Sequence, residues 1–219
     1  MSSILLFSAR GRATFGRMND GKARRKAAAA IQKPSRAALL AAVNRTVPDL
    51  IAPGLAVLFC GINPGLYSAW SRHHFARPGN RFWPALFASG FTNRLLRPDE
   101  EDELLRSGYG ITNLVRRATV GSDELSREEL VAGGRAFARK VTRYRPRAVA
   151  ILGVSAYRWA FDRPAAKVGP QPEKMGDALV WVLPNPSGLN AHFTPNTLTR
   201  VFGELRQAIA QAGNSRQGT

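Results

Sequence analysis

Two asparagines follow apolar stretches of the chain, and a proline follows each of them. Asn63 lies in GINPG, directly after the run AVLFC, and Asn185 opens NPSGLN, directly after ALVWVLP. A side-chain amide is neutral and cannot be a strong general base, but it can orient a water molecule or hydrogen-bond the edge of a nucleobase. Each proline restricts the asparagine before it to extended conformations, which fixes the direction of its side chain.

Between these motifs lies HHFARPGNRFW, residues 73–83, which places Phe75 beside two histidines and two arginines. An aromatic ring in a basic loop can stack on a nucleobase, which contributes about 1–3 kcal/mol per base. The same ring can instead fill the core beneath its loop. The composition of the segment favours neither interpretation over the other.

Short apolar runs alternate with segments of helical periodicity from residue 49 onward. We predict strands at 56–60, 110–115, 148–153 and 178–184. We predict helices at 81–89, 99–107, 154–161 and 195–212, a further one from the capping box of Ser126 and Glu129 to Pro146, and a short one within 35–46. Apolar strands joined through helices indicate a three-layer α/β/α fold around a mostly parallel sheet of four to five strands. Ligands of such sheets bind beyond the carboxyl ends of the strands, so the two asparagine loops are expected at one edge of the sheet.

The charge of the chain indicates a polyanionic partner. Its 219 residues include 32 lysines and arginines against 15 acids, a formal net charge of +17. Such a field attracts nucleic acid, although a solvated basic surface without a partner has the same composition. The single cysteine, Cys60, is expected in the core and excludes a disulfide framework and any four-cysteine metal cluster. No run approaches the roughly 18 apolar residues of a membrane-spanning helix, and a single cysteine fits a reducing, intracellular compartment. With nucleic acid as the expected partner, we expect a cytoplasmic, nucleoid-associated protein in a bacterium, or an organellar or nuclear one in a eukaryote.

The first 48 residues differ from the rest, with ten lysines and arginines and one acid, Asp20. We interpret 1–48 as a basic and mostly disordered N-terminal extension, 49–212 as the folded domain, and 213–219 as a flexible C-terminal tail. The extension adds non-specific affinity for phosphate, serves as a transit peptide, or has no function of its own. The sequence does not decide among these three interpretations.

The motifs GINPG, FARPGNRFW and LPNPSGLN, in this order, resemble those of the mismatch-specific uracil/thymine-DNA glycosylases, the Mug-type branch of the uracil-DNA glycosylase superfamily. The resemblance covers roughly residues 50–210 and includes the segment AILG before the helix at 154. It implies the fold of that superfamily and a monofunctional enzyme of base-excision repair that requires no cofactor. Such an enzyme flips uracil, or thymine or etheno-cytosine opposite guanine, out of double-stranded DNA and hydrolyses its N-glycosidic bond.

The resemblance also implies roles for single residues. Asn63 matches the asparagine that positions the attacking water, and Phe75 matches the aromatic residue that stacks on the flipped base. Asn185 matches the asparagine that contacts the base. The remaining residues expected to line the base pocket are Ile62, Tyr67 and Ser68.

The segment after Asn185 matches the loop that enters the minor groove, where Leu189 is expected to fill the space that the flipped base vacates. Further contacts with the DNA are expected from Ser187, Gly188, Asn190 and His192. Known bacterial members of the branch carry an arginine that contacts the partner strand, whereas this chain has Ala191 at that position. The preference for the opposite base therefore stays open.

Other interpretations compete with this one. A branch acting on uracil in single strands stays open, as does a catalytically silent binder of mismatched or abasic DNA, although an intact Asn63 argues against the latter. A phosphate-binding enzyme is disfavoured because GINPG lacks the lysine and hydroxyl of a P-loop. The three histidines lack metal-ligand spacing, so we expect no metal, and nothing suggests more than a monomer. We expect Trp70 at the DNA, and the tryptophans at 83, 159 and 181 in the packed interior.

Overall fold

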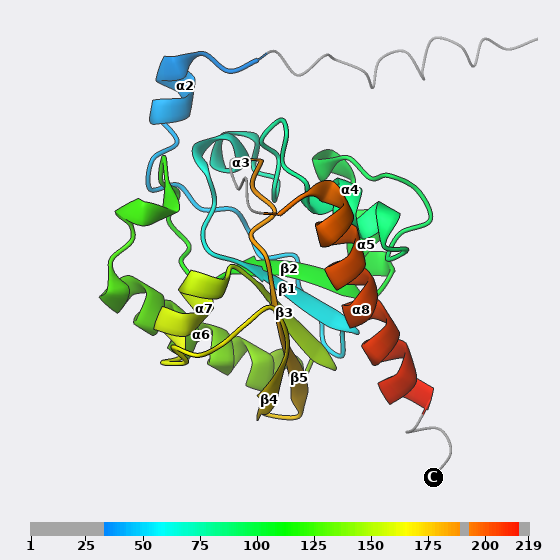
Figure 1. The fold of residues 1–219 in the computed structure, drawn as a ribbon. Helices are drawn as coiled ribbons and strands as arrows, with labels where there is room; N and C mark the ends of the chain where they lie inside the picture. The colour runs from blue at the N-terminus through cyan, green and yellow to red at the C-terminus, as the bar shows by residue number, and fades with distance from the viewer. Residues whose placement is uncertain (1–32, 189–192, 215–219) are drawn as a thin grey trace, which may run out of the picture. The chain divides into compact units, whose positions relative to one another are not determined.

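The computed structural model describes residues 33–188 and 193–214, and its main compact unit begins at Pro34 (Figure 1). A five-stranded sheet forms its centre. The strands are β1 (Val57–Gly61), β2 (Tyr109–Asn113), β3 (Ala148–Leu152), β4 (Gly169–Met175) and β5 (Ala178–Leu183). They lie in the order β2-β1-β3-β5-β4, and all neighbours are parallel except β4, which runs antiparallel to β5. The predicted fold class is confirmed.

Helices cover both faces of this sheet. The helices of the described residues are α2 (Arg36–Leu40), α3 (Leu66–Ser71), α4 (Phe82–Ala88), α5 (Glu101–Arg106), α6 (Arg127–Tyr144), α7 (Val154–Ala160) and α8 (Pro195–Asn214), with 3₁₀ turns η2 (Pro98–Glu100) and η3 (Ser122–Glu124). The predicted capping box forms at the start of α6, where Ser126 Oγ accepts the Glu129 amide at 3.2 Å and Glu129 Oε2 accepts the Ser126 amide at 3.0 Å. Satisfying both backbone donors fixes where this long helix begins.

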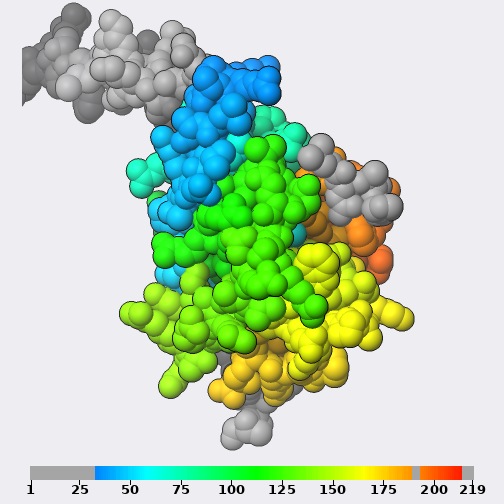
Figure 2. Space-filling model, turned by 90° about the vertical axis from the view of Figure 1, so that its left-hand side faces the viewer, coloured from blue at the N-terminus to red at the C-terminus, as the bar shows by residue number. Residues whose placement is uncertain are grey.

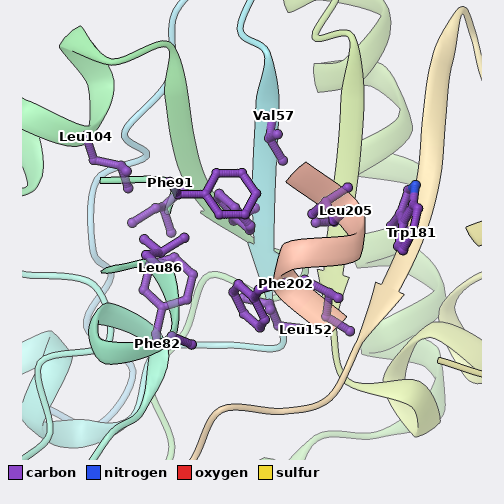
Figure 3. Close-up of a cluster of buried hydrophobic side chains, with 14 of the residues drawn as sticks. Val57, Phe82, Leu86, Phe91, Leu104, Leu152, Trp181, Phe202 and Leu205 are labelled. Atoms are coloured by element: carbon purple, nitrogen blue, oxygen red, sulfur yellow. The ribbon is translucent and has the colours of Figure 1, made fainter. Parts of the chain in front are cut away.

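The first face of the sheet packs against α4, α5 and α8 through an aromatic cluster (Figure 3). Phe59 on β1 lies at its centre, with the rings of Phe82 and Phe91 edge-on at 5.4 and 5.5 Å. Edge-to-face contacts of this kind add to the stabilisation from buried apolar area. Because α4 begins at Phe82, this cluster also anchors the loop that carries Phe75.

The second face packs against α6 and α7. Leu58 and Cys60 of β1 point to this side, as the two-residue period of a strand requires. Cys60 is fully buried, as predicted, and burial raises the pKa of its thiol well above the usual range. A third, small cluster joins Ala42 and Val47 to α3, so part of the segment 34–48 packs on the folded unit.

The structure differs from the sequence pattern in three places. β4 was not predicted, because Pro170 and Pro172 interrupt its pattern. A proline has no N–H to donate to the ladder and is tolerated in a sheet mainly on an edge strand. The six-residue α3 was also not predicted, since its N-cap, Gly65, offers no capping side chain. Trp159 was expected to be packed and this expectation is wrong: 51% of the residue is exposed, whereas Trp83 and Trp181 are buried.

Candidate active site

A cavity of about 370 Å³ opens at the carboxyl edge of the sheet, beyond the ends of β1, β2 and β5. The loops that follow β1 and β5 both contribute to it, as expected from the topology. Its lining residues are Gly61, Ile62, Asn63, Pro64, Gly65, Ser68, His74, Phe75, Arg77, Asn80, Asn113, Thr119, Val120, Gly121, Ser122, Asp123, Leu152, Asn185 and Ser187. Amides and hydroxyls outnumber charged groups here, so the cavity suits a neutral polar ligand.

The amide of Asn63 is held in one orientation. Its Nδ2 donates to the carbonyl oxygen of Arg117 at 3.1 Å and to Thr119 Oγ1 at 2.7 Å. A carbonyl oxygen can only accept, which assigns the nitrogen to that side of the amide. Thr119 donates its own hydrogen to the Gly121 carbonyl at 2.7 Å, so its oxygen is an acceptor toward Asn63. With both N–H groups engaged, Oδ1 has no donor among the described residues and is available to a ligand or water.

The loop that holds Asn63 is itself anchored. The Arg117 guanidinium donates to both carboxylate oxygens of Glu129, at 2.5 and 2.9 Å. These bonds, with the Ser126 amide, lower the pKa of Glu129 to about 2. The capping box of α6 is thereby connected through Arg117 to the amide of Asn63, which fixes the direction of Oδ1 before any ligand arrives.

Phe75 serves as a wall of the cavity and also packs on the core. Its backbone has a φ of 52°, in the left-handed region that is unfavourable for a bulky residue. Its ring stacks on Phe82 at 4.1 Å with an interplanar angle of 28°. One face of the ring therefore contacts the aromatic cluster, while the residue also lines the cavity. Packing in the core beneath its loop and stacking on a base, the two alternatives for Phe75 from the sequence, are therefore compatible with each other.

Glu101 holds the loop that positions Phe75. One carboxylate oxygen is 3.0 Å from His73 Nδ1 and the other accepts the backbone amide of His74 at 3.0 Å. Trp83 Nε1 donates to the His74 carbonyl at 3.1 Å. These bonds engage both the backbone N–H and the carbonyl of His74, and they stabilise the unfavourable left-handed conformation of the next residue, Phe75.

His74 is expected to make the stability of the domain fall as pH is lowered. It is 2% exposed, and its Nε2 lies 2.9 Å from the Pro48 carbonyl, so that nitrogen carries the hydrogen. Burial lowers its pKa, and the nearby carboxylate of Glu101 opposes this only in part. The unfolded chain then binds a proton more readily than the folded one, so stability is full above the ordinary histidine pKa of about 6.5 and declines as pH falls below it.

Urea unfolding at about pH 7.5 and about pH 5 measures this dependence. In His74→Gln, which keeps a donor toward Pro48, we expect a smaller difference between the two pH values than in the wild type. His73→Gln, which leaves the buried ring in place, serves as the control. An unchanged difference in His74→Gln contradicts the prediction.

The loop after β5 is fixed by contacts with the FARPGNRFW segment. Asn185 Oδ1 accepts the Ser187 amide at 3.0 Å, which closes a turn. Arg81 donates to the Ser187 carbonyl at 2.6 Å and to the Phe193 carbonyl. The Cα of Gly188 lies so close to the chain that a Cβ there would be 2.5 Å from the Gly79 carbonyl oxygen. The two motifs thus form one rigid rim of the cavity.

Most of the site residues predicted from the sequence come together here. Those that line the cavity are Ile62, Asn63, Ser68, Phe75, Asn185 and Ser187. Tyr67 is not among the lining residues, and its ring lies edge-on to Trp70 at 5.5 Å. Gly188 lies beside the cavity in the rim. The predicted DNA contacts Leu189, Asn190 and His192, and the divergent Ala191, lie outside the described residues.

The lining residues that were not predicted from the sequence include Asn113, Thr119 and Arg77. Asn113 ends β2 in register with Gly61, is 7% exposed, and its side chain has no hydrogen-bond partner among the described residues. Asn63 was selected because it is a polar residue at the end of an apolar strand, and Asn113, the last residue of GITN, meets the same criterion. Thr119 gave no such signal, since its contact with Asn63 spans 56 residues.

No group of three or more histidine, cysteine, aspartate or glutamate side chains within the described ranges is arranged to hold a metal ion. No helix in the same part of the chain is long and apolar enough to cross a membrane.

The fold and the cavity define a three-layer α/β protein in which neutral amides and an aromatic ring line a cavity at the carboxyl edge of the sheet. The profile of the Uracil DNA glycosylase superfamily matches residues 48–206, so the chain belongs to this superfamily. Its members are DNA glycosylases, which are hydrolases that act on DNA. Family membership therefore supports a DNA glycosylase role with DNA as the substrate.

Among the solved structures that share the fold is the solution NMR structure of a candidate uracil DNA glycosylase from Methanosarcina acetivorans, with a TM-score of 0.50 and 18% sequence identity. The match covers 75% of this chain and 99% of the other. At this identity the likeness concerns the arrangement of helices and strands alone.

Proposed function

We propose that the protein is a monofunctional DNA glycosylase of the mismatch-specific branch, which excises uracil, or thymine or etheno-cytosine opposite guanine, from double-stranded DNA. The observation that carries the proposal is the amide of Asn63, whose two N–H groups are engaged by Arg117 and Thr119 while Oδ1 is left for a water molecule. The order of the motifs GINPG, FARPGNRFW and NPSG supports the same branch.

In the proposed reaction, Oδ1 of Asn63 accepts a hydrogen bond from the water and holds its oxygen near C1′ of the flipped nucleotide. The bond from C1′ to the base nitrogen breaks, and the base leaves with the bonding electron pair. The water oxygen then bonds to C1′, and its proton passes to the departing base anion or to solvent. A neutral amide cannot take that proton, so catalysis depends on positioning and on the stability of the base anion.

The base is proposed to enter the cavity between Phe75 and the polar residues opposite it. One face of the Phe75 ring packs on Phe82, which leaves the other for stacking on a flipped base. Asn185 and Asn113, from the ends of β5 and β2, bring two amides to the cavity. An amide offers both a donor and an acceptor, as the edge of uracil does. The exposed Arg77 at the rim is suited to a DNA phosphate.

Asn113→Ala is expected to lower excision of uracil by roughly 5- to 150-fold, because two neutral hydrogen bonds to a base edge contribute about 0.5–1.5 kcal/mol each. Single-turnover rates on a duplex with one G·U pair measure this. Asn185→Ala is run beside it to compare the two amides. Thermal unfolding of both variants checks that the loss is not one of folding. An unchanged rate in Asn113→Ala removes this residue from base recognition.

The loop after Ser187 is proposed to enter the minor groove, with Leu189 in the space of the flipped base and with Gly188, Asn190 and His192 near the DNA backbone. Ala191 stands where the branch has an arginine that contacts the opposite strand. We therefore expect a weaker preference for guanine opposite the lesion. Rates on U opposite G and on U opposite A test this expectation.

The experiment that tests the function is single-turnover cleavage of a labelled duplex with one G·U pair, in EDTA, followed by heating in alkali to break abasic sites. Strand breaks at the uracil support the proposal. Matched duplexes with G·T or etheno-cytosine, and a single strand with uracil, rank the substrates. Faster excision from the single strand would move the protein to another branch. Tight binding to G·U without breaks would make it a silent binder.

A further inference from the structure

One stretch of the chain is strongly basic. From residue 130 to residue 161 there are seven lysines and arginines and no acid. Much of this stretch is α6, which begins near the cavity and runs to the amino end of β3, at the opposite edge of the sheet (Figure 1). Its positive charge therefore extends away from the proposed base pocket.

Three arginines of α6 form a stripe along its outer side. Arg135, Arg139 and Arg143 are four residues apart, so they lie above one another at intervals of about 6 Å along the helix axis. The buried side of α6 is formed by Leu130, Gly133, Gly134, Phe137 and Val141. At 100° per residue the stripe lies directly opposite that side, and all three arginines are exposed. Figure 2 shows the molecular face that includes this part of the chain, in yellow-green.

The three arginines of the stripe have no acidic partner among the described residues, unlike several other exposed arginines. Arg97, Arg163 and Arg200 each form an ion pair with a neighbouring carboxylate. Among the described residues, no carboxylate pairs with any member of the stripe. Like charges four residues apart destabilise a helix, so a stripe of three is unfavourable unless an anion covers it.

We propose that the stripe of Arg135, Arg139 and Arg143 binds the phosphates of a second segment of duplex DNA, separate from the segment whose base enters the cavity. Arginine binds phosphate through two parallel N–H groups and keeps its charge at every physiological pH. A row of such groups releases counterions from a duplex without reading its sequence. This surface keeps the protein on DNA between lesions. The inference takes DNA as the partner from the proposed function, but it does not require that excision occurs.

The test compares two triple variants with equal charge. Arg135→Gln, Arg139→Gln and Arg143→Gln together remove the stripe, and Arg97→Gln, Arg163→Gln and Arg200→Gln remove three paired arginines elsewhere. Each is titrated with a labelled, undamaged duplex at several salt concentrations. We expect the stripe variant to bind at least tenfold more weakly, with a salt slope smaller by about 3, roughly one for each phosphate that is no longer bound. The control is expected to remain within threefold of the wild type.

Single-turnover excision from a short G·U duplex at saturating protein separates this surface from the cavity. We expect the stripe variant to excise at the wild-type rate. A lower rate would place the stripe in the DNA path of the cavity and overturn the proposal. Equal losses of binding in both variants, or none in either, would also overturn it, as would stripe-dependent binding of duplex RNA or anionic vesicles in preference to DNA. A wild type that excises nothing but shows stripe-dependent binding would refute the proposed function alone.

Discussion

Asn63→Ala is expected to lower single-turnover excision of uracil from a G·U duplex by about 10²–10³-fold, the loss typical of removing one preorganised polar group from an active site. The amide is rigid before the substrate arrives, since Arg117 and Thr119 accept both of its N–H groups. Alanine leaves no atom to orient the water at C1′. Binding of the duplex is expected to change little, because stacking and phosphate contacts do not involve this side chain.

Thr119→Val supplies a matched comparison. It removes the hydroxyl that accepts from Asn63 Nδ2 but keeps the size of the side chain and leaves the bond to the Arg117 carbonyl in place. We expect a rate between those of the wild type and Asn63→Ala, because the water-binding oxygen is retained but less firmly oriented. If Asn63→Ala excises uracil as fast as the wild type, the residue has no role in the reaction.

The contacts of Asn63 also explain why an amide suits this position better than a carboxylate. An aspartate would be a stronger base, but one of its oxygens would face the Arg117 carbonyl oxygen, which now accepts from Nδ2 at 3.1 Å. Two acceptors at that distance repel each other. The loop is therefore adapted to a neutral residue, consistent with a catalyst that acts by positioning.

The fold could be predicted largely from local patterns. Strands such as β1 and β5 are buried on both faces, and this makes each a continuous apolar run that ends at a marked turn. The start of α6 could be predicted because both members of its capping box lie within four residues of each other. β4 could not, since an edge strand with prolines has neither an apolar run nor a regular pattern.

The site could be predicted only in part, because its geometry depends on contacts between distant residues. Asn63 was found from its place after β1, but the partners that orient its amide lie 54 and 56 residues further along the chain. The composition around Phe75 could not show that its ring packs on Phe82 and also borders the cavity. Both facts follow from tertiary packing, which leaves little trace in a single sequence.

Gly61→Ala is expected to lower excision by about 10²-fold, the loss that a displacement of roughly 1 Å can cause in an active site. A Cβ at this position would lie 2.4 Å from Asn113 Oδ1 and 3.2 Å from Phe75 Cζ. Both side chains line the cavity and both would have to move. Because the closer contact is the end of a side chain, we expect the fold to survive with a loss of about 1–3 kcal/mol in the free energy of unfolding.

A double-mutant cycle tests whether this loss acts through Asn113. If the new methyl group works by displacing that amide, Gly61→Ala combined with Asn113→Ala should excise no more slowly than Asn113→Ala alone, since neighbouring sites are then not additive. Gly203→Ala in α8, where nothing lies within 4 Å of the added atom, controls for a methyl group as such. Independent, additive losses would mean that Gly61 is required for another reason. A wild-type rate in Gly61→Ala would show that the base is not held in the part of the cavity beside Gly61, Asn113 and Phe75.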